Sequence, residues 1–438
     1  MIVRFRMKYS TIDLLYSFVS IVSLFGCIWH LSDVSGIYFA YDTTINVNFE
    51  REIMVELPGI TICTDVSWTF AKQYANNNSD FLDLLQSTNE ESEFEFHDRV
   101  WKRLHNLTLS EQLNRATIDS KQFFNSCLIM KPIDFENVVD EDYVQCDQVS
   151  PIYQYITYSK KCFSIGLRLK NESVNRFRID HDTNLRDNGF PLIQIRLNQR
   201  YLHDSVLFIH SRTTPFLGFM GGQTNGIHLN NTKYSSYTLS YVKTTTQLLP
   251  PPFKTLCRRY ETIGYKTLSH CIVSCKANYF VKEFNGWHPD IPANDDYNLN
   301  VYYSKIELKE NKTLDKFMAE RCLNSCSNRQ DCHSEYYSMS VIGQFERRQS
   351  TQAKNENLHG IYIYLPSGLN TRYEHSPRLH LIEFICYFAS VFSLWFGLSI
   401  IAISKALINT VHTYRKRRED EMSKKNDLII DQINLESF

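Results

Sequence analysis

Small and hydroxyl-bearing residues interrupt an apolar run near the C-terminal end of the chain, in the stretch SLWFGLSII that begins at Ser393. Gly397, Leu398 and Ser399 lie in the middle of this stretch. Small residues let helices approach closely, whereas hydroxyls and backbone carbonyls can replace the water around an ion. Periodicity does not separate the two roles, so the stretch predicts either a helix contact or the lining of a pore.

Cysteines form the second group of residues with a chemical role. Ten of the twelve lie between two long apolar runs, while Cys27 and Cys386 lie inside those runs and are expected to be free thiols. An even number of cysteines outside the cell is typical of disulfides, which we favour over zinc ligation and over any other metal site. The ten predicted disulfide cysteines are Cys63, Cys127, Cys146, Cys162, Cys257, Cys271, Cys275, Cys322, Cys326 and Cys332.

Motifs for enzyme chemistry are absent from the sequence. It has no HExxH, no phosphate-binding loop, no GxGxxG that opens a helix and no GxSxG. The 47 basic and 48 acidic residues nearly cancel, so no basic excess points to nucleic acid. Acidic runs at 90–95 and 140–142 are interpreted as solvated faces, with proton or cation sensing as the alternative. We therefore expect no catalytic residues, no cofactor and no nucleic-acid partner.

Two apolar runs would place these residues relative to a membrane. No charged residue occurs from Leu14 to Ser32 or from Phe384 to Ser404, and each run has about the length that crosses a bilayer. A cleaved signal peptide is the competing interpretation of the first run, because basic residues precede it. The run is long, however, and no small-x-small cleavage pattern follows it. Two membrane helices are therefore predicted.

Charge on the flanks of the two runs predicts the topology. Basic residues precede the first run and follow the second, as Arg415–Arg418, so the positive-inside rule places both termini in the cytoplasm. The predicted domains are a cytosolic 1–12, a membrane helix at 13–33, an extracellular 34–380, a second membrane helix with the pore at 381–405, and a cytosolic 406–438. Five sequons fall in the predicted outer domain, which agrees with this topology. They begin at Asn77, Asn106, Asn171, Asn230 and Asn311.

The predicted outer domain mixes strand-like and helical patterns. Paired cysteines four residues apart, as in Cys271 with Cys275 and Cys322 with Cys326, would share one helix face. The fold class is therefore an α+β membrane protein with two helices flanking a large disulfide-rich extracellular domain. The expected strands are 45–63, 153–169, 191–210 with further alternation up to Thr246, and 360–366. The expected helices lie within 80–124 and on both sides of 285–298.

Two architectures fit such a chain: a receptor that the helices only anchor, or a channel in which helices of several subunits surround a pore. A single chain with two helices does not enclose a pore, so a channel must oligomerise. Polar residues in a membrane helix usually face other helices or water, and the second run carries Ser390, Ser393, Ser399 and Ser404. This pattern favours the channel.

Several ordered motifs carry a resemblance to a known family. LPGITIC ends at Cys63, KKCFSIG surrounds Cys162, and a proline step followed by a Cys-x-x-x-Cys opening runs from Gln247 to Cys275. Cys326 and Cys332 then precede Tyr337, and Gly-Leu-Ser follows in the second run. In this order, between two spans, the motifs resemble the degenerin/epithelial sodium channel family over nearly the whole chain.

The resemblance implies a subunit of a trimeric, amiloride-sensitive channel that passes sodium down its gradient across the plasma membrane. The subunits would form a homotrimer or a heterotrimer with sister subunits, embedded in the lipid bilayer. It implies an outer domain with a β-rich palm and β-ball, a helical finger at about 70–130 and a helical thumb at about 253–335. Gly397, Leu398 and Ser399 would form the selectivity filter, and the permeant sodium ion would be the only bound group.

Further roles also follow from the resemblance alone. Tyr41 and Phe253 match an aromatic contact that couples the outer domain to the pore. The cysteine order implies the pairs Cys63–Cys162 and Cys127–Cys146, with the other six cysteines stapling the thumb in a nested arrangement around Cys257–Cys332.

Three positions depart from the family pattern. Asp13 stands where a gating His-Gly pair begins, Tyr387 replaces an acidic residue at the outer mouth, and Lys405 replaces one below the filter. Three lysines at one level of a homotrimer would repel cations. A non-conducting accessory or receptor-like subunit is therefore the alternative function. An ATP-gated purinergic channel shares the topology, but its cysteine spacing and lysine-rich nucleotide site are not found here.

Overall fold

The computed structural model describes most of the chain in two units. One unit contains Met1–Thr44 with Pro377–Phe438, the other contains Ile45–Ser376, and each is described by itself. The described residues are 11–50, 54–65, 118–131, 143–156, 160–167, 178–180, 191–212, 226–230, 234–287, 291, 302–303, 312–346, 358–365, 369–397 and 400–435.

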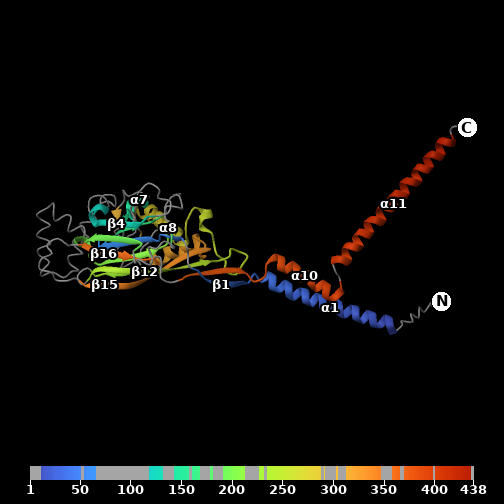
Figure 1. Cartoon of the computed structure of the whole chain (residues 1–438), viewed down its shortest axis with the longest axis horizontal. Helices are drawn as coiled ribbons and strands as arrows, with labels where there is room; N and C mark the ends of the chain where they lie inside the picture. The colour runs from blue at the N-terminus through green and yellow to red at the C-terminus, as the bar shows by residue number, and fades with distance from the viewer. Residues whose placement is uncertain are drawn as a thin grey trace. The chain divides into compact units, whose positions relative to one another are not determined.

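The first unit is built from three helices, α1 (Thr11–Phe39), α10 (Leu381–Phe396) and α11 (Ile400–Leu435). In the part of the chain that the structure describes, α1 alone is long and apolar enough to cross a membrane, over Leu14–Phe39 with a mean hydropathy of 1.8. Figure 1 shows α10 beside α1, and α11 as a separate helix. The second apolar run is therefore divided between two helices, which differs from the single helix expected at 381–405.

A large mixed sheet dominates the second unit (Figure 1). Its long antiparallel pair is β12 (Tyr234–Gln247) with β15 (His333–Glu346). On the other edge of β12, one strand pairs in parallel with residues 236–239 and another pairs in parallel with residues 244–247. The path through the sheet is β1 (Thr43–Glu50), β17 (Asn370–Pro377), β12, β16 (Leu358–Ile363), β9 (Ile193–Asn198), β4 (Phe124–Met130) and β5 (Tyr143–Gln145).

A second sheet is almost entirely buried. Every residue of β3, β7 and β10 is buried, because these strands combine β-branched residues with small hydroxyl residues that find partners inside. The order is β11 (Ile227–Leu229), β10 (Ser205–His210), β3 (Gly59–Asp65), β7 (Lys160–Ile165) and β6 (Tyr153–Ile156). Two short pairs are β2 (Met54–Glu56) with β8 (Arg178–Asp180), and β13 (Gly286–Trp287) with β14 (Tyr302–Tyr303).

One hydrophobic core joins the two sheets. Ile60 and Phe163 from the small sheet pack in the same cluster as Ile195 and Leu239 from the large one. Phe163 also stacks on Phe123 with ring centroids 4.4 Å apart. Burial of this apolar surface is the main stabilising contribution to the second unit.

Two longer helices lie in the predicted thumb region, α8 (Leu268–Phe284) and α9 (Lys312–Ser325). The Thr267 side chain accepts a hydrogen bond from the His270 N–H and so caps α8. The short helical segments are α6 (Ser120–Phe123), α7 (Cys146–Val149), η4 (Gln199–Tyr201) and η6 (Tyr260–Ile263). Most of the predicted finger at 70–130 lies outside the described residues.

All ten predicted disulfide cysteines are paired. Cys63–Cys162, Cys127–Cys146 and Cys257–Cys332 are the pairs that the resemblance implied. Cys271–Cys326 and Cys275–Cys322 join α8 to α9. Cys27 and Cys386 are free, as expected.

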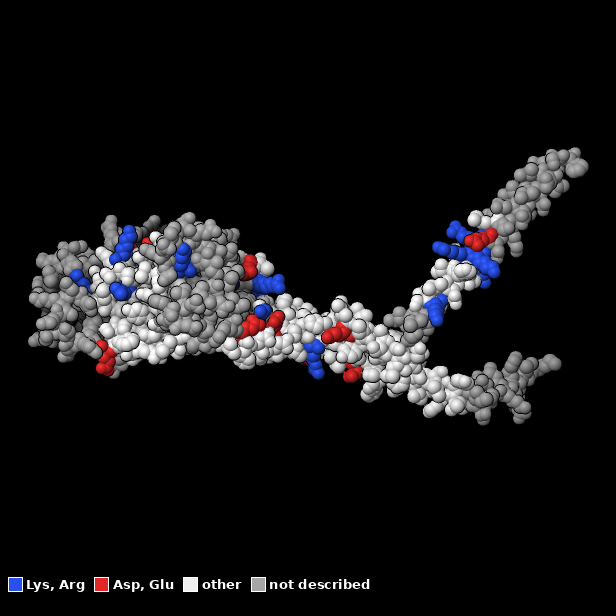
Figure 2. Space-filling model, viewed as in Figure 1, with Lys and Arg blue, Asp and Glu red and all other residues white. Residues whose placement is uncertain are grey.

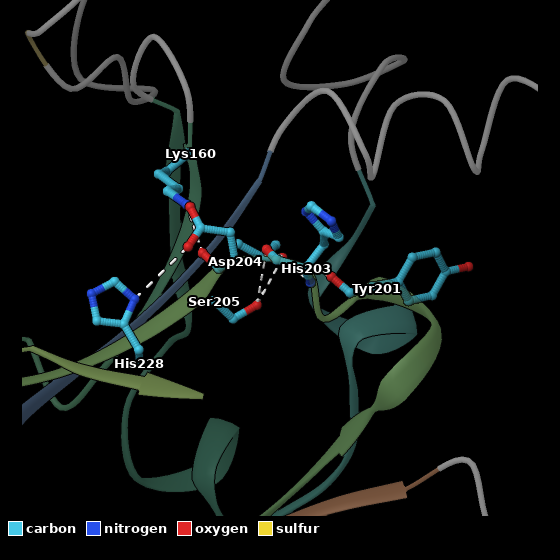
Figure 3. A network of polar contacts seen from close by, with 7 residues as sticks. Lys160, Tyr201, His203, Asp204, Ser205 and His228 are labelled. Carbon is cyan, nitrogen blue, oxygen red and sulfur yellow. Dashed lines mark hydrogen bonds and ion pairs between the residues drawn. The ribbon is translucent and has the colours of Figure 1, made fainter. Parts of the chain in front are cut away.

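A polar network fixes the turn that precedes β10 to the neighbouring strands (Figure 3). The Lys160 ammonium donates to the Asp204 carbonyl over 2.6 Å and pairs with the Asp204 carboxylate. The Thr64 hydroxyl donates to the Tyr201 carbonyl over 2.7 Å, and the Ser205 hydroxyl donates to Thr64 over 3.0 Å. These bonds hold a turn in which Asp204 has a φ of 41°.

Candidate functional site

The candidate site lies in the first unit, where α1, α10 and the start of α11 hold the residues singled out in the second apolar run. At its outer end, the segment after α1 is bound to the segment before α10. The Arg378 N–H donates to the Asp42 carbonyl over 2.9 Å, and the guanidinium lies 3.7 Å from the Asp42 carboxylate. The His380 N–H donates to the Glu383 carboxylate over 2.9 Å and so caps α10. These bonds fix the C-terminal end of α1 next to the N-terminal end of α10.

Aromatic rings connect the two helices below this point. Tyr38 stacks on Phe384 with ring centroids 4.3 Å apart and an interplanar angle of 20°. From Phe384, a row of rings continues along α10 at i,i+4 spacing through Phe388, Phe392 and Phe396. The row gives α10 a stiff aromatic edge that extends to its last residue.

Hydroxyl side chains lie between the large apolar residues of α10. The Ser390 hydroxyl donates to the Cys386 carbonyl of its own helix over 2.7 Å, a bond that satisfies a hydroxyl in an apolar environment. Ser393 and Tyr387 are exposed in the single chain, Tyr387 to 55%. Both side chains are thus accessible in the single chain, and their pore-lining or gating roles stay predictions.

The end of α10 is set by Gly397. Its φ of 60° and ψ of 22° are left-handed, and a Cβ built there would meet no heavy atom within 4 Å. Glycine is therefore required for its backbone angle and not for space. The last carbonyls of a helix lack intrahelical partners and form the negative end of the helix dipole. The carbonyl oxygens at the end of α10 therefore lie at a negative helix end, which attracts cations. Leu398 and Ser399 lie outside the described residues.

Charge is sparse along α1 and α10 and concentrated on α11. Figure 2 shows the surface of α1 and α10 mostly without charged side chains, and basic side chains gathered on α11. Lys405 and the run Arg415–Arg418 are exposed there. A charge-poor helix pair followed by a basic helix is the pattern that the positive-inside rule predicts for the cytosolic side of a membrane.

The other predicted positions are only partly described. Asp13 is within α1, but its side chain lies outside the described residues. Tyr41 belongs to the first unit and Phe253 to the second, so their contact stays a prediction. Asn230 is exposed, as a glycosylation site must be, and the other four sequon asparagines lie outside the described residues. Among the described residues, no group of acidic, histidine or cysteine side chains could hold a metal ion.

Within the second unit, β17 is the strand whose chain continues into α10, and polar contacts secure it to β12. The Lys243 N–H donates to the Asn370 side chain over 3.2 Å, and the Arg372 guanidinium donates to the Gln247 side chain over 3.0 Å. A polar cavity of about 430 Å³ lies beside these strands and the Cys257–Cys332 disulfide. Residues 371–374 of β17 are thus held against β12 by parallel pairing and by these side-chain hydrogen bonds.

A largely buried ion pair joins β12 to β15 within the large sheet. The Lys243 ammonium lies 3.0 Å from the Glu335 carboxylate, which also accepts a hydrogen bond from the Ser211 hydroxyl over 2.8 Å. Burial alone would raise the pKa of Glu335, but the bond from His333 and the charge of Lys243 outweigh it and lower the pKa to about 2. Glu335 is therefore ionised at physiological pH.

Sequence reasoning identified Gly397 but missed the contacts that position it. Asp42 with Arg378 and Tyr38 with Phe384 pair residues more than three hundred positions apart in the sequence, and no local pattern signals them. The i,i+4 row of phenylalanines was visible in the sequence, since four rings at helical spacing form one helix edge.

Comparison with known proteins provides an independent line of argument. The family model described as amiloride-sensitive sodium channel matches residues 3–406. No curated protein matches the chain. Among the solved structures that do match, a proton-activated chloride channel shares 8% identity with a TM-score of 0.29, over 91% of this chain and 96% of that chain. A likeness of that size carries no argument about fold or permeant ion.

Proposed function

Because the chain belongs to the amiloride-sensitive sodium channel family, whose members are ion channels and not enzymes, we propose that it is a subunit of a trimeric, sodium-selective channel. Membership of the family also implies that it resides in a membrane. In our proposal the membrane is the plasma membrane, both termini are cytoplasmic, the sequons are glycosylated and amiloride blocks the current. Sister subunits of the same family can complete the trimer.

The second span of this channel is α10 together with the break and the first turns of α11. The 16 residues of α10 rise by roughly 24 Å, which is less than the approximately 30 Å of a bilayer core. The apolar first turns of α11 supply the missing length. Broken helices are tolerated at membrane depth only where they are buried in protein or line a water-filled path. A break at this depth therefore favours a pore-lining role.

The observation that carries the proposal is the left-handed break at Gly397 inside an apolar run of a channel-family chain. Carbonyls at the end of α10, and the adjacent residues Leu398 and Ser399, would surround sodium when three subunits meet. Carbonyl and hydroxyl oxygens replace part of the ion's hydration shell. Two helices per chain do not close such a ring, so the function requires oligomerisation.

The test is thiol modification of the break while current is recorded. The Gly397→Cys variant, in a Cys386→Ser background, is expressed in oocytes alone and with sister subunits. A positively charged methanethiosulfonate reagent is applied from outside. It should react with the thiol while the channel is open and so block the amiloride-sensitive current. The Leu407→Cys variant is the control, because Leu407 is exposed on α11 beyond the break. Native current that is absent in every combination with surface protein confirmed would contradict the proposal. So would a Gly397→Cys current, already reduced by the left-handed backbone angle, that the reagent leaves unaffected.

A further inference from the structure

A close contact in the first unit joins α1 to the last turn of α10. A Cβ built on Gly26 would lie 2.3 Å from Cη2, 2.5 Å from Cζ2 and 2.7 Å from Cζ3 of Trp395. These three atoms belong to the six-membered ring of the indole, so the ring lies flat against the backbone of α1. Carbon atoms pack at about 3.5–4.0 Å, so no larger residue fits at position 26 while the indole stays in place.

The buried side chains of the two helices are neighbours of this pair. Cys27, which follows Gly26, is 2% exposed, and Val391, one turn before Trp395, is 5% exposed. Most described side chains of α1 and α10 are exposed in the single chain. The helices are therefore held together chiefly at their outer aromatic contact and at Gly26 with Trp395.

Packing of the indole ring against α1, and not a hydrogen bond to a described residue, holds the Trp395 side chain in place. Its Nε1 atom is buried and has no hydrogen-bond partner among the described residues. A buried indole N–H usually finds an acceptor, so an unpaired donor at this depth means that ring packing against Gly26 outweighs its cost. A ring without the N–H would lose no hydrogen bond here.

The pair lies two residues before the break. Trp395 precedes Phe396, the last ring of the aromatic row, and Gly397, where the helix ends. Two residues of helix correspond to about 3 Å along the axis. Whatever fixes the Trp395 ring against α1 therefore also fixes the direction in which the last carbonyls of α10 point.

We propose that Gly26 and Trp395 are size-matched positioning residues, which hold the inner end of α10 against α1 and thereby set the position of the Gly397 break. Neither residue touches the ion. The test by current rests on the proposed function. The test by cross-linking depends only on the packing of the two helices.

The first test is a substitution series with a matched control on the same helix. Gly26→Ala should lower the amiloride-sensitive current per surface channel by roughly fivefold to thirtyfold, as expected when a close helix contact is overfilled. It should also change the sodium-to-potassium permeability ratio, which a simple loss of folded protein would leave unchanged. Gly36→Ala should leave both properties unchanged, because a Cβ at Gly36 meets nothing within 4 Å.

Rescue distinguishes size matching from a general intolerance of position 26. Trp395→Phe removes the part of the ring that meets the new Cβ, together with the unpaired N–H. The double variant Gly26→Ala with Trp395→Phe should therefore recover current and permeability ratio to within about twofold of the native channel. Gly26→Ala behaving like Gly36→Ala would overturn the inference, and so would a loss that Trp395→Phe leaves uncorrected.

The second test does not depend on conduction. In the full chain with Cys27→Ser and Cys386→Ser, a short bifunctional thiol reagent should link Gly26→Cys to Trp395→Cys within one chain, as read by mass spectrometry. The control pair is Gly36→Cys with Trp395→Cys, whose first member lies about 15 Å further along α1 and should stay unlinked. Cross-linking without current in any variant would refute the proposed function and leave the pairing intact. Current without cross-linking would refute the pairing.

Discussion

At the scale of single residues, the backbone of Gly397 is the feature on which the account depends. A left-handed conformation costs a residue with a Cβ roughly 1–2 kcal/mol, and the site offers no compensating contact. Gly397→Ala should therefore straighten the break or destabilise it, and reduce the current per surface channel by about fivefold to thirtyfold. Gly36→Ala, in the open interior of α1, is the matched control and should have no effect. Paired recordings with surface biotinylation measure both; equal currents would show that the left-handed angle is not needed for conduction.

We predict that conduction by a homomer depends on Lys405. It is exposed on α11 five residues into the helix, so three copies would place like charges at one level of a homotrimer. Lys405→Glu should increase sodium current through homomers, while Lys416→Glu, exposed further along the same helix, should change it little. Oocyte currents normalised to surface protein provide the measurement. No increase for Lys405→Glu would mean that this lysine does not face the ion path.

Glu335 should make the stability of the second unit depend on pH. Its pKa is lowered to about 2 in the folded chain from an ordinary value of 4.5, so the stabilisation is complete above 4.5 and is lost as the pH falls toward 2. The difference corresponds to on the order of 3 kcal/mol. Thermal unfolding of the purified protein should therefore show a smaller difference between native and Glu335→Gln at pH 3 than at pH 7.

The control for this experiment is Glu374→Gln, since Glu374 is 42% exposed and lies 3.8 Å from Arg372. Its effect on the unfolding temperature should be small and nearly the same at both pH values. If Glu335→Gln showed the same pH-independent pattern, the buried pair with Lys243 would not contribute the predicted stabilisation.

At the scale of elements, two nested disulfides join α8 to α9. Cys275–Cys322 lies inside the loop closed by Cys271–Cys326, with three residues between the bridges on each side. Removing one bridge therefore frees only a short additional loop, which corresponds to about 2–3 kcal/mol in the chain-entropy description. Removing both frees the whole segment between the helices. The loss for the quadruple Cys→Ser variant should exceed the sum of the two double-variant losses, as measured by denaturant unfolding; strict additivity would contradict the nested arrangement.

Some elements could be predicted from the sequence because their signal is local. The strands β3, β7 and β10 have runs of β-branched and apolar residues, and α8 has a capping threonine and cysteines at helical spacing. By contrast, β17 has the sequence NTRYEHSP, without apolar alternation, and becomes a strand through its parallel register with β12 and its polar contacts. Tertiary pairing overrides weak local preference in such a strand, which lies between β1 and β12.

The second apolar run shows the same limit at the candidate site. Hydropathy treats Phe384–Ser404 as one helix, because a single glycine hardly changes a window average. The structure ends α10 at Phe396, because Gly397 adopts an angle that hydropathy does not register. Gly397 could be found by family resemblance, whereas its partners could not, because Gly26 and Trp395 meet only once the two helices are packed.

At the scale of the whole molecule, the chain divides its tasks between two units. The second unit is an α+β domain with five disulfides and one core. The first unit is a helix pair with a break that leads into a basic helix. The family match over residues 3–406 includes both. In the proposed channel, two helices per chain would make the pore a property of the assembly, and residues exposed in the single chain, such as Tyr387 and Ser393, would face other subunits or the pore.

The most direct test of this account is the reversal potential of the amiloride-sensitive current in cells that express the chain alone or with sister subunits. Replacing external sodium by a large organic cation should shift the reversal potential to more negative voltages, by about 59 mV for a tenfold reduction in sodium. Replacing external chloride by gluconate should leave it unchanged. A reversal potential that follows chloride and ignores sodium would contradict a cation pathway formed at the end of α10.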